Sequence, residues 1–128
     1  MKVAVIGSRS IVDKNWVFEQ ITNYIEEELT GTSSITIISG RAKGVDQLAE
    51  AYALNYDLDF VGFEPYYRLD PKATFENRYF FIRNTQIVRE SDAVLILWDG
   101  SSNGTHDVIS KCKKWNKKHK IILFETKE

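Results

Sequence analysis

The chain has 128 residues, of which 43% are hydrophobic and 27% are charged. This composition is typical of one globular domain, expected to span residues 1–128, and argues against disorder. A formal net charge of −1 excludes a protein held on nucleic acid or an anionic membrane by its overall charge alone. The single cysteine, Cys112, excludes a disulfide framework and a cysteine-based zinc cluster. Because no apolar run approaches the ~20 residues that span a bilayer and the first residues lack a signal-peptide pattern, we expect no membrane partner and a cytoplasmic location.

The first half of the chain predicts two strand–helix units and a third strand. A β-branched strand at 2–6 precedes a helix at 14–29, whose expected buried stripe is Phe18, Ile21, Ile25 and Leu29. A short strand at 35–39 and a glycine-containing loop at 40–44 lead to a helix at 45–56. The apolar face of that helix is expected to contain Val45, Leu48, Ala49, Tyr52, Ala53 and Tyr56. The third strand is expected at 58–63.

The second half continues the alternation. A loop at 64–72 contains both prolines, and a helix is expected at 73–90. The run AVLILW at 93–98 is nearly continuous in apolar residues, as expected of a strand covered on both faces. A polar turn at 99–104 precedes a helix at 105–117, and the last strand is expected at 120–125. The buried face of the last helix is expected to contain Val108, Ile109, Cys112 and Trp115.

Five strands alternating with four helices predict an α/β fold. We expect a three-layer, Rossmann-like architecture, with a five-stranded parallel sheet of order 3-2-1-4-5 and helices on both faces. Right-handed crossovers gather the carboxyl ends of the strands at one edge, where doubly wound folds bind their ligands.

Three loops at that edge combine glycine with hydroxyl and basic side chains. Glycine lets the backbone approach a ligand closely, and helix amino ends bind phosphate readily. Arginine adds bidentate contacts to phosphate oxygens. The residues expected to bind a phosphate-bearing small molecule are Gly7, Ser8, Arg9, Ser39, Gly40, Arg41, Lys43, Gly44, Arg83, Asn84, Asp99, Gly100, Ser101, Asn103, Gly104 and Thr105. Neither a dinucleotide fingerprint nor a Walker motif is present. Two acidic side chains have open roles: Asp46 as a helix cap or a partner of Lys43 or Arg9, and Asp99 as a ribose contact or the start of a turn.

Several motifs together resemble a known family. SGRAKGVDQLAEAYA at 39–53, the Arg83–Asn84 pair and SDAVLILWDGSSNGT at 91–105 are similar to the YspA/YpsA-related branch of the SLOG superfamily, which also includes the Lonely Guy phosphoribohydrolases and the DNA-processing protein DprA. The resemblance implies a nucleotide-derived ligand, such as a nucleotide, an ADP-ribose derivative or a cyclic nucleotide signal, that is sensed or sequestered in bacterial defence or phage counter-defence. Aligned with Lonely Guy enzymes, Arg83 and Asp107 take the catalytic positions. Here, however, Asn84 replaces a lysine, the 99–103 turn replaces a PGG motif, and aspartate replaces glutamate.

Three hypotheses follow. The first is binding of the nucleotide-derived small molecule, with no cofactor, no metal and a homo-oligomer as the expected state. The second is hydrolysis of the N-glycosidic bond of a nucleoside monophosphate, with Asp107 and Arg83 as the catalytic residues. The third is nucleic-acid binding in the manner of DprA through the lysine-rich stretch at 111–120, which the near-zero net charge disfavours. The aromatic cluster at 66–81 is open to three interpretations: core, base-stacking lid or subunit interface.

Overall fold

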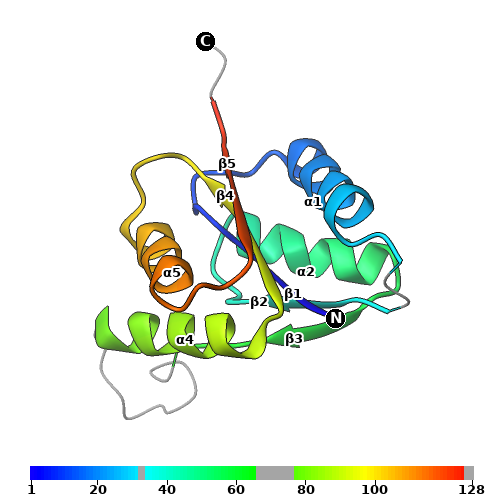
Figure 1. The fold of residues 1–128 in the computed structure, drawn as a ribbon. Coiled ribbons are helices and arrows are strands. Elements are labelled where there is room, and N and C mark those ends of the chain that lie inside the picture. Colours follow the sequence, from blue (N-terminus) through cyan, green and yellow to red (C-terminus); the bar gives the residue numbers. More distant parts are fainter. Residues whose placement is uncertain (32–33, 66–76, 126–128) are drawn as a thin grey trace.

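The computed structural model describes residues 1–31, 34–65 and 77–125 (Figure 1). Its centre is a sheet of five parallel strands in the order β3-β2-β1-β4-β5, which confirms the predicted topology. The strands are β1 (Lys2–Gly7), β2 (Thr36–Ser39), β3 (Asp59–Gly62), β4 (Ala93–Trp98) and β5 (His119–Leu123). β4 is buried along nearly its whole length, as its apolar sequence predicted.

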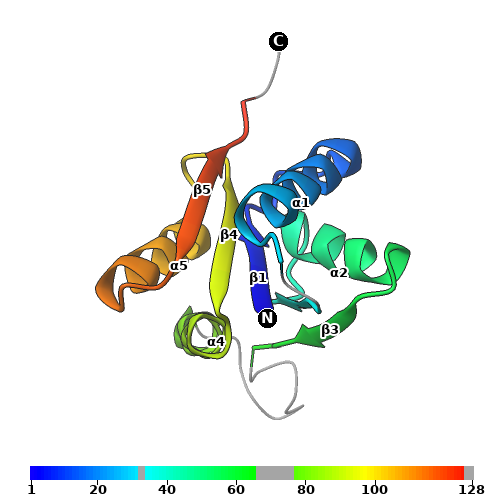
Figure 2. The ribbon, with the colours of Figure 1, turned by 45° about the vertical axis from the view of Figure 1, so that its right-hand side comes forward.

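In the described part of the chain, four helices cover the two faces of the sheet (Figure 2). They are α1 (Lys14–Glu28), α2 (Val45–Asn55), α4 (Asn77–Glu90) and α5 (Asn103–Lys114). The residues of α1 and α2 pack in one hydrophobic cluster and those of α4 and α5 in another, on opposite sides of the strands. The three-layer α/β architecture is therefore confirmed. In the described ranges, no helix is both long and apolar enough to cross a membrane.

The buried face of α1 is rotated relative to the expected stripe. Val17, Ile21 and Tyr24 are buried, whereas Phe18 and Ile25 are only partly buried. The reason is the neighbouring helix: the Phe18 ring packs edge-on against the Tyr52 ring of α2, with 5.1 Å between centroids. Phe18 thus fills the seam between the two helices, and Val17 faces the sheet.

Two aromatic residues expected in the core lie instead at helix ends. Tyr56 follows α2 and is 52% exposed, and Trp115 follows α5 and is 37% exposed. α5 begins two residues earlier than predicted and ends three residues earlier. It ends early because Asn116 adopts a left-handed conformation with a φ of 50°, which terminates a helix. Trp115 therefore lies outside the buried face and contacts the Arg89 guanidinium, 5.4 Å from its ring centroid.

Gly44 fixes the approach of α2 to β1. It precedes the first residue of α2 with a φ of 79°, and a Cβ at this position would lie 2.5 Å from the Ser8 carbonyl oxygen. Only glycine lets the two loops pass this closely. The close passage brings the amino end of α2 beside the loop that follows β1, at the carboxyl edge of the sheet.

Candidate functional site

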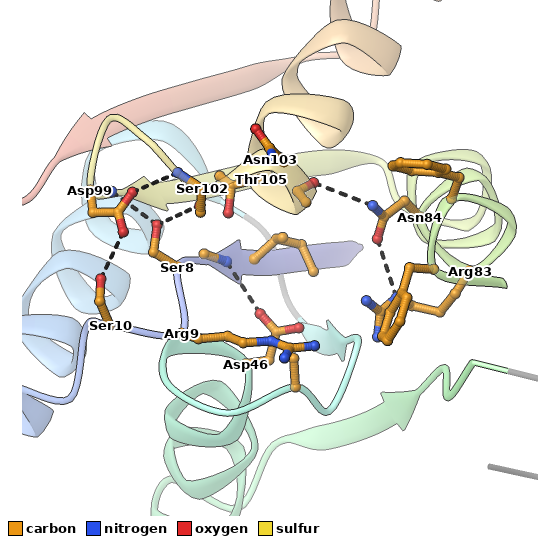
Figure 3. A pocket seen from close by; sticks show the side chains of 16 residues that line it. Ser8, Arg9, Ser10, Asp46, Arg83, Asn84, Asp99, Ser102, Asn103 and Thr105 are labelled. Carbon is orange, nitrogen blue, oxygen red and sulfur yellow. Dashed lines mark hydrogen bonds between the residues drawn. The ribbon is translucent and has the colours of Figure 1, made fainter. Parts of the chain in front are cut away.

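A cavity of about 580 Å³ opens at the carboxyl edge of the sheet (Figure 3). The loops after β1 and β4, the amino ends of α2 and α5, and one face of α4 surround it. This is the edge at which the predicted topology placed a ligand site. The predicted residues that line this cavity are Gly7, Ser8, Arg9, Arg83, Asn84, Asp99, Asn103, Gly104 and Thr105.

The other predicted residues lie outside the cavity lining. The largest departure is Arg41, whose φ of 55° directs its side chain away to ion pairs with Glu50 and Glu64. Lys43 is exposed in the same loop, and the hydroxyl of Ser39 is buried, where it donates to the Asp46 carbonyl oxygen at 2.8 Å. The remaining residues that do not line the cavity are Gly40, Gly44, Gly100 and Ser101.

Arg83 is held in place by contacts on several sides. Its side chain is buried, with the residue 7% exposed, and its Nη1 donates to the Gly40 carbonyl oxygen at 2.6 Å. Its Nε donates to Asn84 Oδ1 at 3.2 Å. The Asn84 amide in turn donates to the Gly104 carbonyl oxygen at 3.3 Å. These contacts join α4 to the β2–α2 loop and to the first turn of α5, so the guanidinium is preorganised at the cavity wall.

The ring of Phe80 contacts two guanidinium groups. The Arg83 Cζ atom lies 5.4 Å and the Arg9 Cζ atom 5.6 Å from its ring centroid. Both contacts are within the range of cation–π attraction. The ring therefore helps to hold both arginines, which come from α4 and from the loop after β1, beside one cavity.

Asp46 is a buried carboxyl group of the cavity wall. The residue is 3% exposed, and its Oδ1 accepts a hydrogen bond from the Gly7 amide at 3.2 Å. Burial raises its pKa to about 6, although Arg83, the backbone N–H groups of Gly7 and Ala42, and Arg9 all act in the opposite direction. Of the two roles left open by the sequence, that of a charge partner is favoured, because the positive charges of Arg83 and, more weakly, of Arg9 lower the pKa of this carboxyl.

Asp99 organises the turn between β4 and α5. Its Oδ1 accepts from the backbone N–H groups of Ser101 and Ser102, both at 2.9 Å, and its Oδ2 accepts from the Ser10 hydroxyl at 2.8 Å. The hydrogen bonds, first of all that from Ser101, lower the pKa of this carboxyl to about 2. Asp99 is therefore the start of the turn, one of its two open roles, and it also ties the turn to the loop after β1.

The amino end of α5 faces the cavity without a side-chain cap. Ser102 occupies the N-cap position, but its side chain makes no capping hydrogen bond. Its hydroxyl instead lies 2.9 Å from the Ser8 hydroxyl. Because no side chain of the cap uses them, the first N–H groups of α5, next to Asn103, Gly104 and Thr105 of the lining, are available to an anion.

Asp107, the expected catalytic acid, does not line the cavity. Its Oδ2 accepts from Lys111 Nζ at 2.5 Å and from Asn84 Nδ2 at 3.1 Å. The carboxylate is thus neutralised by a lysine one turn along α5 and used to orient Asn84. This geometry suits a positioning role for Asp107 and offers no reacting group to the cavity.

Sequence reasoning missed several residues of the lining. They are Ile6, Ser10, Ala42, Asp46, Phe80, Phe81 and Ser102. Ala42, Asp46 and Ser102 lie within the loops that were singled out but were not counted among the ligand-binding residues, and Ser10 lies directly after one of these loops. Phe80 and Phe81 belong to the aromatic cluster at 66–81, of which residues 66–76 lie outside the described part of the chain.

Solved structures with a similar fold come from DNA-processing proteins. The X-ray structure of DNA processing protein A (DprA) from Streptococcus pneumoniae matches with a TM-score of 0.75 and 21% sequence identity over 97% of this chain, and this chain spans half the length of that protein. DNA processing protein A from Helicobacter pylori, studied for its single-stranded DNA binding mode, matches with a TM-score of 0.73 and 20% identity over all of this chain and 67% of the other. No curated protein matches the chain.

These comparisons overturn two expectations. The predicted ligand was a free nucleotide-derived small molecule, and nucleic acid was disfavoured as a partner. Both expectations are wrong, because the matching family is that of a DNA recombination mediator and one structural neighbour binds single-stranded DNA. The hydrolase alternative, which required the same small-molecule ligand, is overturned with them. The error arose from net charge, which averages over the chain and does not report a local site.

The broader resemblance is confirmed at the level of the SLOG and DprA-like superfamily. The family model described as "DNA recombination-mediator protein A" matches residues 1–64, which is half of the chain and includes β1, β2, β3 and the amino end of α2 at the cavity. The chain therefore belongs to the DNA recombination-mediator protein A family.

Proposed function

We propose that this protein binds single-stranded DNA, with the backbone phosphates held in the cavity at the carboxyl edge of the sheet. The observation that carries the proposal is the convergence of Arg9, Arg83 and the uncapped amino end of α5 on one cavity of about 580 Å³. Guanidinium groups and helix amino ends are the groups that bind phosphate in proteins. The family and the single-stranded DNA binding of the Helicobacter pylori protein support the same ligand.

The aromatic lining of the cavity favours a single strand over a duplex. Phe80 and Phe81 line the cavity beside the two arginines. Proteins that bind single strands combine basic grooves with aromatic rings on which bases stack, at about 1–3 kcal/mol for each base. A duplex offers no free base face on which these rings could stack.

The lysine-rich stretch at 111–120 is the weaker candidate for the DNA-binding surface. Lys111 is paired with Asp107 in α5, and Lys117 Nζ donates to the Ser91 carbonyl oxygen at 2.6 Å. Lys118 donates to the Glu28 carbonyl oxygen, and Lys120 pairs with Glu27. Because these four lysines already have partners within the chain, their charges are less available to phosphate.

The test is fluorescence anisotropy of a labelled oligothymidylate titrated with protein over a range of salt concentrations. Arg9→Ala and Arg83→Ala are each expected to weaken binding and to reduce the slope of log K against log salt by about 0.7 for each phosphate that the variant no longer neutralises. The matched control is the double variant Lys113→Ala and Lys114→Ala, at the end of α5 remote from the cavity, which is expected to bind like the wild type. Equal weakening in all variants, or tighter binding of duplex than of single strand, would contradict the proposal.

Two finer assignments accompany this proposal. Within the superfamily, we place the chain in the YspA/YpsA-related branch on the strength of the 39–53 and 91–105 motifs, and we treat residues 1–128 as one domain. We also propose a cytoplasmic location, because the buried free thiol of Cys112 fits a reducing compartment.

A further inference from the structure

A buried carboxylate lies in the wall of the cavity that, under the proposed function, receives phosphate. Asp46 is 3% exposed and accepts a hydrogen bond from the Gly7 amide. Taking a carboxylate out of water is costly unless a positive charge compensates it, and a carboxylate also repels a phosphate group nearby. Its presence in an anion site therefore requires an explanation that the phosphate contacts alone do not supply.

The charge compensation for Asp46 comes from the arginines that would bind phosphate. A Cβ at Gly40 would lie 2.8 Å from Asp46 Oδ2 and 2.9 Å from Arg83 Nη1, so the carboxylate and the guanidinium both lie beside this glycine. Arg83 approaches from α4 and Arg9 from the loop after β1 (Figure 3). In the described ranges, these are the charged side chains that act on the carboxyl group; β1 and the β2–α2 loop contribute the backbone N–H groups of Gly7 and Ala42.

We propose that Asp46 is the resident counter-anion of the site, and that single-stranded DNA binds with uptake of one proton by the Asp46 carboxylate. This inference rests on the proposed function and adds a regulatory property to it. The proton comes from the solvent and goes to a carboxylate oxygen of Asp46, and no covalent bond to the DNA forms or breaks. The neutral carboxyl group then leaves Arg83 and Arg9 to the phosphate.

The direction of the coupling follows from the charges. A bound phosphate adds a negative neighbour and draws on the same guanidinium groups, so it favours the protonated form of Asp46. Burial has already raised the pKa of this carboxyl to about 6 in the free protein, so protonation near neutral pH costs little. Affinity should therefore be highest below about pH 6 and fall as the pH rises above it, by at most about tenfold per pH unit for one proton.

The experiment measures affinity for an oligothymidylate with hydroxyl groups at both ends, from about pH 5 to about pH 8. The missing terminal phosphates matter, because a phosphomonoester itself titrates near pH ~6. Calorimetric titrations in two buffers of different ionisation enthalpy count the protons taken up. We expect uptake approaching one proton near pH ~7, and Asp46→Asn should bind with an affinity that is flat with pH and exceeds that of the wild type at alkaline pH.

Two control variants separate this effect from other charges. Glu50→Gln removes one negative charge outside the cavity, and His106→Gln removes the exposed imidazole of α5. Both are expected to keep the pH dependence of the wild type. If the pH dependence disappears in His106→Gln and survives in Asp46→Asn, the inference is wrong.

The remaining outcomes distinguish the inference from the function on which it rests. Binding of single-stranded DNA by the wild type with no pH dependence and no proton uptake would overturn the role of Asp46 and leave the proposed function standing. No binding at any pH would overturn both. Should Asp46→Asn fail to fold, the proton count on the wild-type protein still decides the question.

Discussion

Replacing Asp46 with asparagine should change the way in which the free energy of unfolding depends on pH. The carboxyl group has a pKa of about 6 in the folded chain, against an ordinary value of 3.8, because it is buried. A difference of about two pKa units corresponds to about 3 kcal/mol, since each unit represents 1.36 kcal/mol. This is the amount by which the ionised carboxylate should destabilise the native state.

The sign of the effect is opposite to that of an ordinary salt-bridged aspartate. Above about pH 6, Asp46 is ionised in both states and the native state carries the full penalty of about 3 kcal/mol. As the pH falls from about 6 to about 3.8, the native state retains its proton better than the unfolded state does, and the penalty disappears. Asp99 acts in a separate range, because its lowered pKa of about 2 affects stability only below about pH 3.8.

Urea unfolding followed by tryptophan fluorescence, at pH values between about 4 and about 7, measures the effect. The stability difference between Asp46→Asn and the wild type should shift by about 2–2.5 kcal/mol in favour of the variant from the acidic to the neutral end, because the carboxyl group of the unfolded chain is still partly ionised at about pH 4. All other carboxyl groups are shared by the two proteins and cancel in this difference. Glu50→Gln, a half-exposed site on α2, should show a flat difference. A flat difference for Asp46→Asn as well would refute the argument that burial dominates at this site.

The remaining predictions concern the packing of loops and core. Gly44→Ala should lower the free energy of unfolding by at least about 1–3 kcal/mol, because its Cβ would lie 2.5 Å from the Ser8 carbonyl oxygen. Gly100 has a similar φ of 89° but open space around it, so Gly100→Ala should lower the free energy of unfolding by about 1–2 kcal/mol. Thermal unfolding of the two variants compares them, and equal costs would show that φ alone matters. Cys112 is fully buried, and burial raises the pKa of its thiol to about 11. Iodoacetamide should therefore label it only in denaturant, and rapid labelling of the native protein at pH ~8 would contradict this packing.

The order of the strands was predictable because it depends on local patterns. The β-branched and apolar runs, the helical spacing of α2 and the alternation of strand with helix are read directly from neighbouring residues, and the handedness of crossovers then restricts the topology. The glycine and serine loops after β1 and β4 were predictable for the same reason, since the carboxyl ends of parallel strands share one edge. Helix ends were less predictable, because the left-handed turn at Asn116 has only a weak sequence signal.

The membership of the site was decided by tertiary structure. Arg41 stands among the loop glycines in the sequence, yet its backbone conformation turns it toward Glu50 and Glu64. Asp46 shows the reverse case. Gly7 and Arg83, which act on its carboxyl group, lie far away in the chain, and no local sequence pattern predicts that they come close to it. Local sequence determined which strands and loops form, because turn chemistry and periodicity act over a few residues. Only the packing of α4 across the sheet edge decided which charges face one another, because that depends on contacts between distant segments.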